Sequence, residues 1–274
     1  MTGWVLVALL AAADPAARER AGRASALLSY VAGDYAVAVG PRGEILSPEE
    51  LAEQGQFVRE AAAELRASSA EDLAGELDQL AGWVDARAAP PEVIGRAQRI
   101  AALIAQRFDL AVLPRAQPDL RRGQRLYRQA CAACHGRDGT PPPAERLPLP
   151  TRPVAFASKP DMSRLSPQRV FSAATYGVPG TAMPSFGDAL TLGERWDLAF
   201  YALTLAHKGA RERARGEELL RKAPRTPDFL QLAVRSDDQL RAALSRSGLS
   251  PADREAVLSA VRAAFPASPG RASR

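Results

Sequence analysis

The sequence predicts an all-α protein with an N-terminal helical bundle, a second helical domain and a short helical C-terminal tail. Only 6% of its 274 residues are aromatic, and Ala, Arg and Leu dominate, which favours helices over strands. Apolar residues recur at helical spacing, and no stretch shows the alternation of a strand. Helix starts are marked by N-capping residues, namely Ser47 before Pro48, Thr191 with Glu194, Ser236 with Gln239, and Ser250 before Pro251.

The distribution of charge divides the chain. The net charge is +5, yet residues 14–118 hold 11 basic and 16 acidic residues, residues 119–207 hold 11 and 7, and residues 208–274 hold 14 and 8. An acidic first half and a basic second half indicate separate modules, and Pro114 and Pro118 mark a linker between them. We therefore expect a signal peptide, an acidic helical domain, a second helical domain and a basic helical tail, over residues 1–13, 14–115, 116–207 and 208–274.

The basic part of the chain does not predict nucleic-acid binding. Its arginines are interleaved with acidic residues, and no nucleic-acid motif accompanies them. A solvated surface explains these charges, and docking to an acidic partner or to an anionic lipid surface is the alternative.

The first residues resemble an export segment. Trp4 to Ala13 form an apolar run of ten residues, which is too short to span a bilayer, and small residues suited to signal-peptidase cleavage follow. Because no Lys or Arg precedes the run, the first turns of an ordinary helix remain an alternative. No other stretch is long and apolar enough for a transmembrane span. We expect an exported, periplasmic protein, and a partner can associate it with a membrane.

The residues Cys131-Ala132-Ala133-Cys134-His135 form a haem attachment signature. Two thiols three residues apart can add to the two vinyl groups of one haem, and a histidine directly after them can bind the iron. Redox chemistry of the thioredoxin type would require a βαβ context, which is absent. A zinc site would require four ligands, and the chain has only two cysteines and two histidines. The sequence predicts one covalent haem c on Cys131 and Cys134, with His135 as an iron ligand.

The second axial ligand is predicted to be Met183. This residue lies in the segment Gly177-Val178-Pro179-Gly180-Thr181-Ala182-Met183-Pro184, whose glycines and prolines predict a rigid extended loop. Met162, His207 and solvent are the alternatives, and Met183 can also be a core residue. We expect Met162 to be a packing or surface residue, and His207 to be an exposed cation at a helix end.

Residues 119–207 resemble class I cytochromes c. The helix before the haem motif carries Leu120, Gly123 and Leu126 on one face, and a later helix, residues 192–205, presents Trp196 and Phe200. The resemblance implies that these two helices cross beside the haem. It also implies a methionine ligand from a segment such as that of Met183, and a proline carbonyl, of Pro148 or Pro150, that accepts the N–H of His135. The implied activity is one-electron transfer rather than catalysis, and a haem enzyme or gas sensor with an open iron is the alternative.

Nearly the whole chain resembles bacterial proteins in which a cytochrome c module precedes a high-affinity iron permease. The resemblance rests on the segments 28–35, 53–57, 177–186, 194–201 and 232–240. It implies a redox partner protein and an association with a membrane iron permease. The permease half and its Arg-Glu-x-x-Glu motif are absent here, so we expect either a separate permease chain or a standalone relative. A cytochrome subunit or electron acceptor of an unrelated dehydrogenase or respiratory chain is the alternative.

Overall fold

The protein is helical throughout the part of the chain that the structure describes. This computed structural model describes residues 14–110, 113–178, 180–222 and 228–263, so the expected signal peptide lies outside the described residues. Within those ranges the regular structure is helical apart from one isolated bridge between Val39 and Ile45. The predicted all-α class is confirmed. The chain divides into two compact units, residues 1–110 and 111–274.

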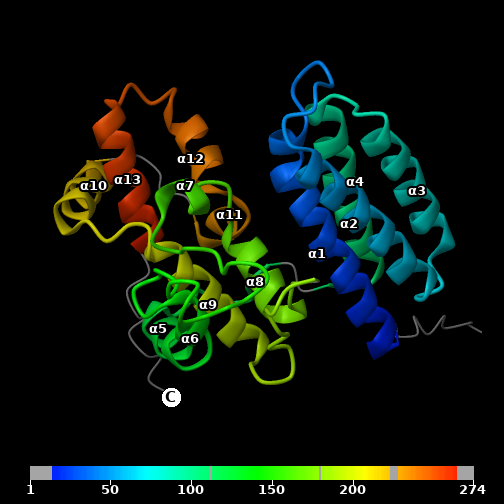
Figure 1. The fold of residues 1–274 in the computed structure, drawn as a ribbon. Coiled ribbons are helices and arrows are strands. Elements are labelled where there is room, and N and C mark those ends of the chain that lie inside the picture. The colour runs from blue at the N-terminus through cyan, green and yellow to red at the C-terminus, as the bar shows by residue number, and fades with distance from the viewer. Residues whose placement is uncertain (1–13, 111–112, 179, 223–227, 264–274) are drawn as a thin grey trace, which may run out of the picture. The chain divides into compact units, whose positions relative to one another are not determined.

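The first unit is built from four long helices (Figure 1). They are α1 (Pro15–Ala38), α2 (Pro48–Arg66), α3 (Glu71–Asp85) and α4 (Pro90–Arg107). Ser47 caps α2 as predicted, since its side chain accepts a hydrogen bond from the backbone N–H of Glu50, and Pro48 occupies the first turn. Helix α1 packs against both α2 and α4, and α3 packs against α2 and α4.

The core of this unit is mainly apolar. Leu28, Val31, Leu65, Leu77 and Ile104 are among the side chains buried in it. Tyr35 is also fully buried, and its hydroxyl donates to the carbonyl of Ala88 at 3.0 Å. This bond satisfies the one polar group that the ring brings into the core.

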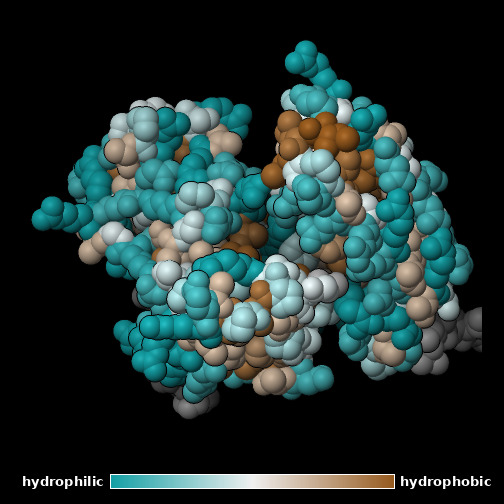
Figure 2. Space-filling view, in the orientation of Figure 1, coloured by the Kyte–Doolittle hydropathy of each residue, from teal (hydrophilic) through white to brown (hydrophobic). Residues whose placement is uncertain are grey.

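Most of the visible surface is hydrophilic (Figure 2). On the first unit, apolar surface gathers near the end of α1, where the loop to α2 begins. In this loop Ile45 and Leu46 are 46% and 58% exposed. None of the described helices combines the length and apolar character that a membrane span requires.

The second unit contains shorter helices. They are α5 (Leu120–Leu126), the π-helical turn η1 (Tyr127–Cys131), α6 (Ala132–His135), α7 (Lys159–Met162), α8 (Pro167–Tyr176), α9 (Leu192–Thr204), α10 (Ala210–Lys222), α11 (Phe229–Val234), α12 (Asp237–Leu244) and α13 (Pro251–Ala263). Thr191 and Ser236 form the predicted capping boxes of α9 and α12. The oxygen of Ser250 accepts from the N–H of Asp253 at the start of α13. These helix starts follow directly from local sequence.

Helices α5 and α9 cross in close contact, as the sequence predicts. A Cβ atom on Gly123 would lie 2.2 Å from the carbonyl oxygen of Asp197 and 2.8 Å from Cβ of Tyr201. Only glycine therefore permits this approach of the two backbones. The crossing is held at its edge by Asp197, which is buried, pairs with Arg122, and accepts from the N–H of Asp119 at 2.8 Å.

The tail helices share one hydrophobic core with the helices around the haem motif. Leu232, Leu240 and Leu258 of the tail belong to the same buried cluster as Tyr127 and Phe200. The sequence places a boundary after residue 207, whereas this cluster continues across it, and the compact unit runs from 111 to 274. The chain between α9 and α10 is short, so the tail returns directly onto α9.

We predict that Gly123→Ala destabilises the second unit by about 1–3 kcal/mol, because an added methyl group would force two packed backbones apart. Urea unfolding followed by circular dichroism measures the change. Gly193→Ala is the matched control within α9, since the nearest atom to its Cβ would be 3.7 Å away. If both variants unfold at the wild-type urea concentration, the close crossing is wrong.

Candidate haem site

The two cysteines lie on successive turns of one helical segment. Cys131 ends the π-helical turn η1 and Cys134 lies within α6, and both are free thiols. The N–H of Ala132 donates to the carbonyl of Tyr127, five residues earlier, which is the bond of a π-turn. Cys131 is buried, and burial, with a smaller contribution from Cys134, raises the pKa of its thiol to about 12. This pKa keeps Cys131 a neutral thiol near pH 7, and neither sulfur atom is bound in a disulfide.

His135 is buried and oriented by one hydrogen bond. Its Nδ1 atom lies 3.0 Å from the carbonyl oxygen of Val154. Because a carbonyl oxygen only accepts, Nδ1 carries the proton, and the lone pair of the neutral ring is then on Nε2. Burial lowers the pKa of His135, and the bond to Val154 offsets this only in part. The neutral ring with a free Nε2 is the form that binds a metal ion.

The carbonyl that accepts from His135 is not the one that the resemblance implies. Pro148 or Pro150 is the expected acceptor of this N–H, and the structure assigns the role to Val154 instead. The reason is a backbone bond nearby, in which the N–H of Ala157 donates to the carbonyl of Gly139 at 2.9 Å. This bond fixes the chain after Pro153 beside the haem motif, and the ring of Phe156 packs 4.6 Å from that of His135.

The chain turns sharply away directly after His135. Gly136 has φ = +77°, and a Cβ atom there would lie 1.9 Å from the carbonyl oxygen of Thr140. Glycine is therefore required at this position. The hydroxyl of Tyr127 donates to the carbonyl of Gly136 at 2.9 Å, which ties the turn to the helix before the motif.

The segment that carries Met183 is a tight loop anchored to α8. The N–H of Val178 donates to the carbonyl of Met183 at 3.2 Å, and the N–H of Met183 donates to Oγ1 of Thr181 at 3.1 Å. The hydroxyl of Ser185 donates to the carbonyl of Thr175 in α8 at 2.6 Å. The Met183 side chain is partly exposed. The described residues of this segment form a hydrogen-bonded loop, whereas the rigidity expected for it and iron ligation by Met183 stay predictions.

The other two candidates for the second axial position have different roles. Met162 is fully buried within the core of the second unit, so the packing interpretation holds for it. The prediction that His207 is an exposed cation is wrong, because its side chain is fully buried. Its Nε2 lies 2.7 Å from Oδ2 of Asp237 and its Nδ1 lies 3.1 Å from Oγ of Ser259. With both ring nitrogens engaged, His207 has none left for iron.

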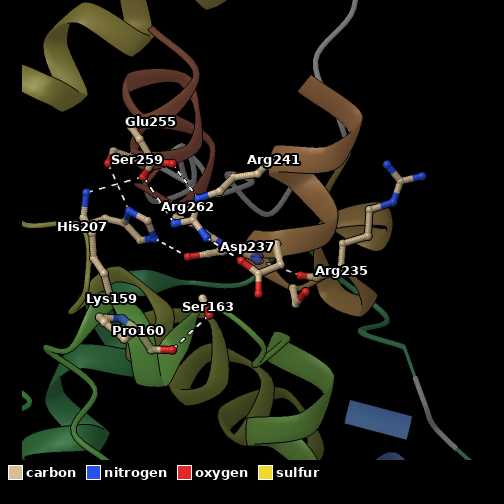
Figure 3. Close-up of polar contacts among 12 residues, drawn as sticks. Lys159, Pro160, Ser163, His207, Arg235, Asp237, Arg241, Glu255, Ser259 and Arg262 are labelled. Carbon is tan, nitrogen blue, oxygen red and sulfur yellow. Dashed lines mark hydrogen bonds and ion pairs between the residues drawn. The ribbon is translucent and has the colours of Figure 1, made fainter. Parts of the chain in front are cut away.

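His207 belongs to a buried polar network that joins α9 to the tail (Figure 3). Asp237 receives the bond from His207 on one oxygen and pairs through the other with Nε of Arg262 at 2.8 Å. Arg262 also donates to the carbonyls of Leu232 and Arg235. Sequence reasoning missed this network, although an Asp and an Arg on apolar helix faces could have indicated it. Within the described ranges, no group of three or more His, Cys, Asp and Glu side chains is arranged to hold a metal ion.

We predict that Asp237→Asn costs about 3–5 kcal/mol of unfolding free energy, because it leaves Arg262 buried without its counter-charge. Burial raises the pKa of Asp237, but the bonds from His207 and Arg262 outweigh burial and hold it below its usual range. The contribution of the carboxylate is therefore complete above about pH 3.9, the pKa of an unfolded Asp, and is lost as the pH falls through the lower folded value.

Urea unfolding at neutral and acidic pH tests this prediction. The wild type should lose stability as the pH falls below about 4. Asp237→Asn should be less stable than the wild type at neutral pH, and its unfolding free energy should change less with pH in the acidic range. Asp253→Asn is the control, since it removes a carboxylate that is 25% exposed and pairs with the more exposed Arg215, so stability should change little. Equal stability of the wild type and Asp237→Asn at neutral pH would contradict the buried network.

The comparison with known families agrees with this site. Residues 118–201 match the family model described as cytochrome C oxidase, cbb3-type, subunit III. No curated protein and no solved structure matches the chain. The matched residues include the paired thiols, His135 with its engaged Nδ1, and the crossing of α5 with α9. The chain therefore contains a cytochrome c domain over residues 118–201, whose activity is haem-based electron transfer.

Proposed function

We propose that this chain is an exported c-type cytochrome that carries one haem and acts as a one-electron carrier. The observation that supports this most strongly is the hydrogen bond that Nδ1 of His135 donates to the carbonyl of Val154. This bond leaves Nε2 unprotonated, with a lone pair that can bind iron, and two free thiols precede His135 in the sequence. The sequence holds no other cysteine pair, so a single covalent haem fits the chain.

The residues of the chain each supply one part of the proposed site. Cys131 and Cys134 would form the two thioether bonds, and His135 would bind the iron through Nε2. Met183 would present its thioether from the anchored loop between α8 and α9. When bound, haem supplies a reversible Fe(III)/Fe(II) couple, and a thioether ligand favours the reduced state. The Val154 carbonyl holds the proton on Nδ1 and so increases the donor strength of Nε2.

Ligation by both His135 and Met183 favours an electron carrier over an enzyme. If both side chains held the iron, no iron position would be left for a substrate or a gas. Electron exchange with a partner protein is then the remaining activity. Residues 119–207 are net basic, with 11 basic and 7 acidic residues, and this charge favours an acidic redox partner.

We place this carrier in the periplasm, in association with a membrane iron permease. The support is the resemblance of segments along the chain to proteins that join a cytochrome c module to such a permease. Haem is attached to this kind of motif outside the cytoplasm, which supports export. The apolar run within residues 1–13 supports it too. The exchange of electrons during Fe(II)/Fe(III) handling is the role that this association suggests.

A respiratory subunit is the second candidate, because the matching family model is described by a subunit of an oxidase. Both candidates use the same haem site and differ only in the partner. Cross-linking of the full chain in its native host, followed by identification of the captured membrane protein, separates them. An iron permease supports the first candidate and an oxidase or dehydrogenase subunit supports the second.

We predict that Met183→Leu converts the site to one with an open iron, because leucine preserves volume but cannot ligate. The oxidised wild type should show the weak charge-transfer band of a thioether-ligated ferric haem, and the variant should lose it. The reduction potential should fall by on the order of 0.1 V, well within the ~0.8 V range that axial ligands span. The reduced variant should bind carbon monoxide, whereas the reduced wild type should not.

Met162→Leu is the matched control, since Met162 is a buried core residue, and it should keep the band. If Met162→Leu loses the band and Met183→Leu keeps it, Met183 is not the ligand. If the wild type lacks the band and binds carbon monoxide readily, a haem enzyme or sensor replaces the electron carrier.

A further inference from the structure

The 154–163 segment joins the surroundings of His135 to the tail helices. Its first residue, Val154, accepts the bond from His135, and its last residue, Ser163, accepts a bond from the tail. These two contacts are only nine positions apart along the chain. A displacement at one end is therefore transmitted over a short, well-packed distance to the other end.

The end near His135 is held by three contacts. The carbonyl of Val154 lies 3.0 Å from Nδ1 of His135, and the ring of Phe156 packs against the imidazole. The N–H of Ala157 donates to the carbonyl of Gly139, in the turn that follows the haem motif. These contacts place the carbonyl of Val154 but leave the segment beyond residue 157 to other anchors.

Those anchors come from the tail. Nζ of Lys159, the first residue of α7, lies 3.1 Å from Oε1 of Glu212 in α10 and 3.7 Å from Oε2 of Glu255 in α13. The N–H of Asp238 in α12 donates to the carbonyl of Ser163 at 2.9 Å. In Figure 3 the side chain of Lys159 extends from α7 toward the network that contains His207 and Ser259. Each of three tail helices thus contacts the 154–163 segment.

The two carboxylates that meet Lys159 are themselves fixed. Glu212 accepts from the hydroxyl of Ser259 at 2.8 Å, and Ser259 in turn contacts His207. Glu255 pairs with Arg241 at 2.6 Å. Because both carboxylates have partners within the tail, little side-chain entropy remains to be lost when Lys159 binds them. Lys159 is therefore attached to a rigid part of the tail.

We propose that Lys159 is a positioning residue for His135, through which the tail helices set the strength of the hydrogen bond from Nδ1 to Val154. This inference rests on the proposed haem ligation by His135. A strong bond increases the donor strength of Nε2, and a stronger donor favours Fe(III). Weakening the anchor at Lys159 should loosen the bond and shift the equilibrium toward the reduced protein.

Four variants of the full chain, each with haem attached, test the proposal, and Glu212→Gln is the fourth. Lys159→Gln removes the charge that binds the two carboxylates, and Lys159→Arg keeps it. Lys222→Gln is the control, since Lys222 is 70% exposed and pairs with Glu218 of its own helix. The first readout is the exchange rate of the His135 Nδ1 proton in the reduced protein, measured by nuclear magnetic resonance. The second is the ratio of reduced to oxidised protein against a reference dye.

Lys159→Gln should speed exchange of that proton and raise the reduced-to-oxidised ratio by about three- to fivefold, the range of a partly exposed ion pair. A tenfold change in this ratio would be ~59 mV for one electron. Lys159→Arg and Lys222→Gln should match the wild type in both readouts. Glu212→Gln, which keeps an oxygen for Ser259 but loses the charge, should shift both readouts in the same direction as Lys159→Gln.

Wild-type values of both readouts in Lys159→Gln and in Glu212→Gln would overturn the proposal, even if thermal stability falls. If Lys159→Gln does not fold, Glu212→Gln alone decides between the two outcomes. Failure of the wild type to attach haem, or retention of haem ligation after His135 is replaced, would instead contradict the proposed function.

Discussion

The carbonyl of Val154 keeps the proton of His135 on Nδ1, and so leaves the lone pair of the neutral imidazole on Nε2, where a metal ion can bind. The two residues are 19 positions apart, so the bond closes a loop that starts at the paired thiols. Gly136 allows the chain to reverse directly after the ligand, and the bond from Ala157 to Gly139 returns it to the ring. The loop that follows the haem motif thus orients the His135 ring.

The helices around the haem motif are held together by close packing and by buried polar pairs. Helix α5 leads into the motif, and its crossing with α9 requires a glycine at position 123 because the two backbones touch there. The tail then packs into the same core as α9, and His207, Asp237 and Arg262 satisfy one another where the tail meets it. Buried charges are stable only when they are paired in this way. The second unit is therefore one cooperative body in which the tail supports the haem motif.

Local features were predictable from the sequence, and long-range polar partners were not. The two thiols and His135 are adjacent in sequence, so their chemistry is evident from spacing alone. Caps such as Ser47 and Thr191 act within a single turn and were equally evident. Gly123 was correctly assigned to a helix contact, since a glycine on an otherwise apolar helix face leaves room for the backbone of a second helix.

The features that the sequence did not predict depend on contacts between residues far apart in the chain. Whether Val154 or a proline carbonyl accepts the hydrogen bond from His135 depends on which part of the following loop folds back onto the imidazole ring. No residue type in the sequence identifies that part of the loop. His207 resembles a helix-end cation in the sequence because its partners lie 30 and 52 residues away, in helices that only folding brings close. The boundary expected after residue 207 follows a change in charge and stays a prediction, while apolar residues on both sides of it share one core.

We propose that residues 131–135 hold one haem whose iron changes its charge by one electron. A spectroelectrochemical titration of the full chain, with haem content measured on the same sample, is the direct test. We expect one haem per chain, resistant to extraction by acidified solvent, and a single reversible wave that fits a one-electron transition. A chain that yields extractable haem, more than one haem, or no reversible wave would contradict it.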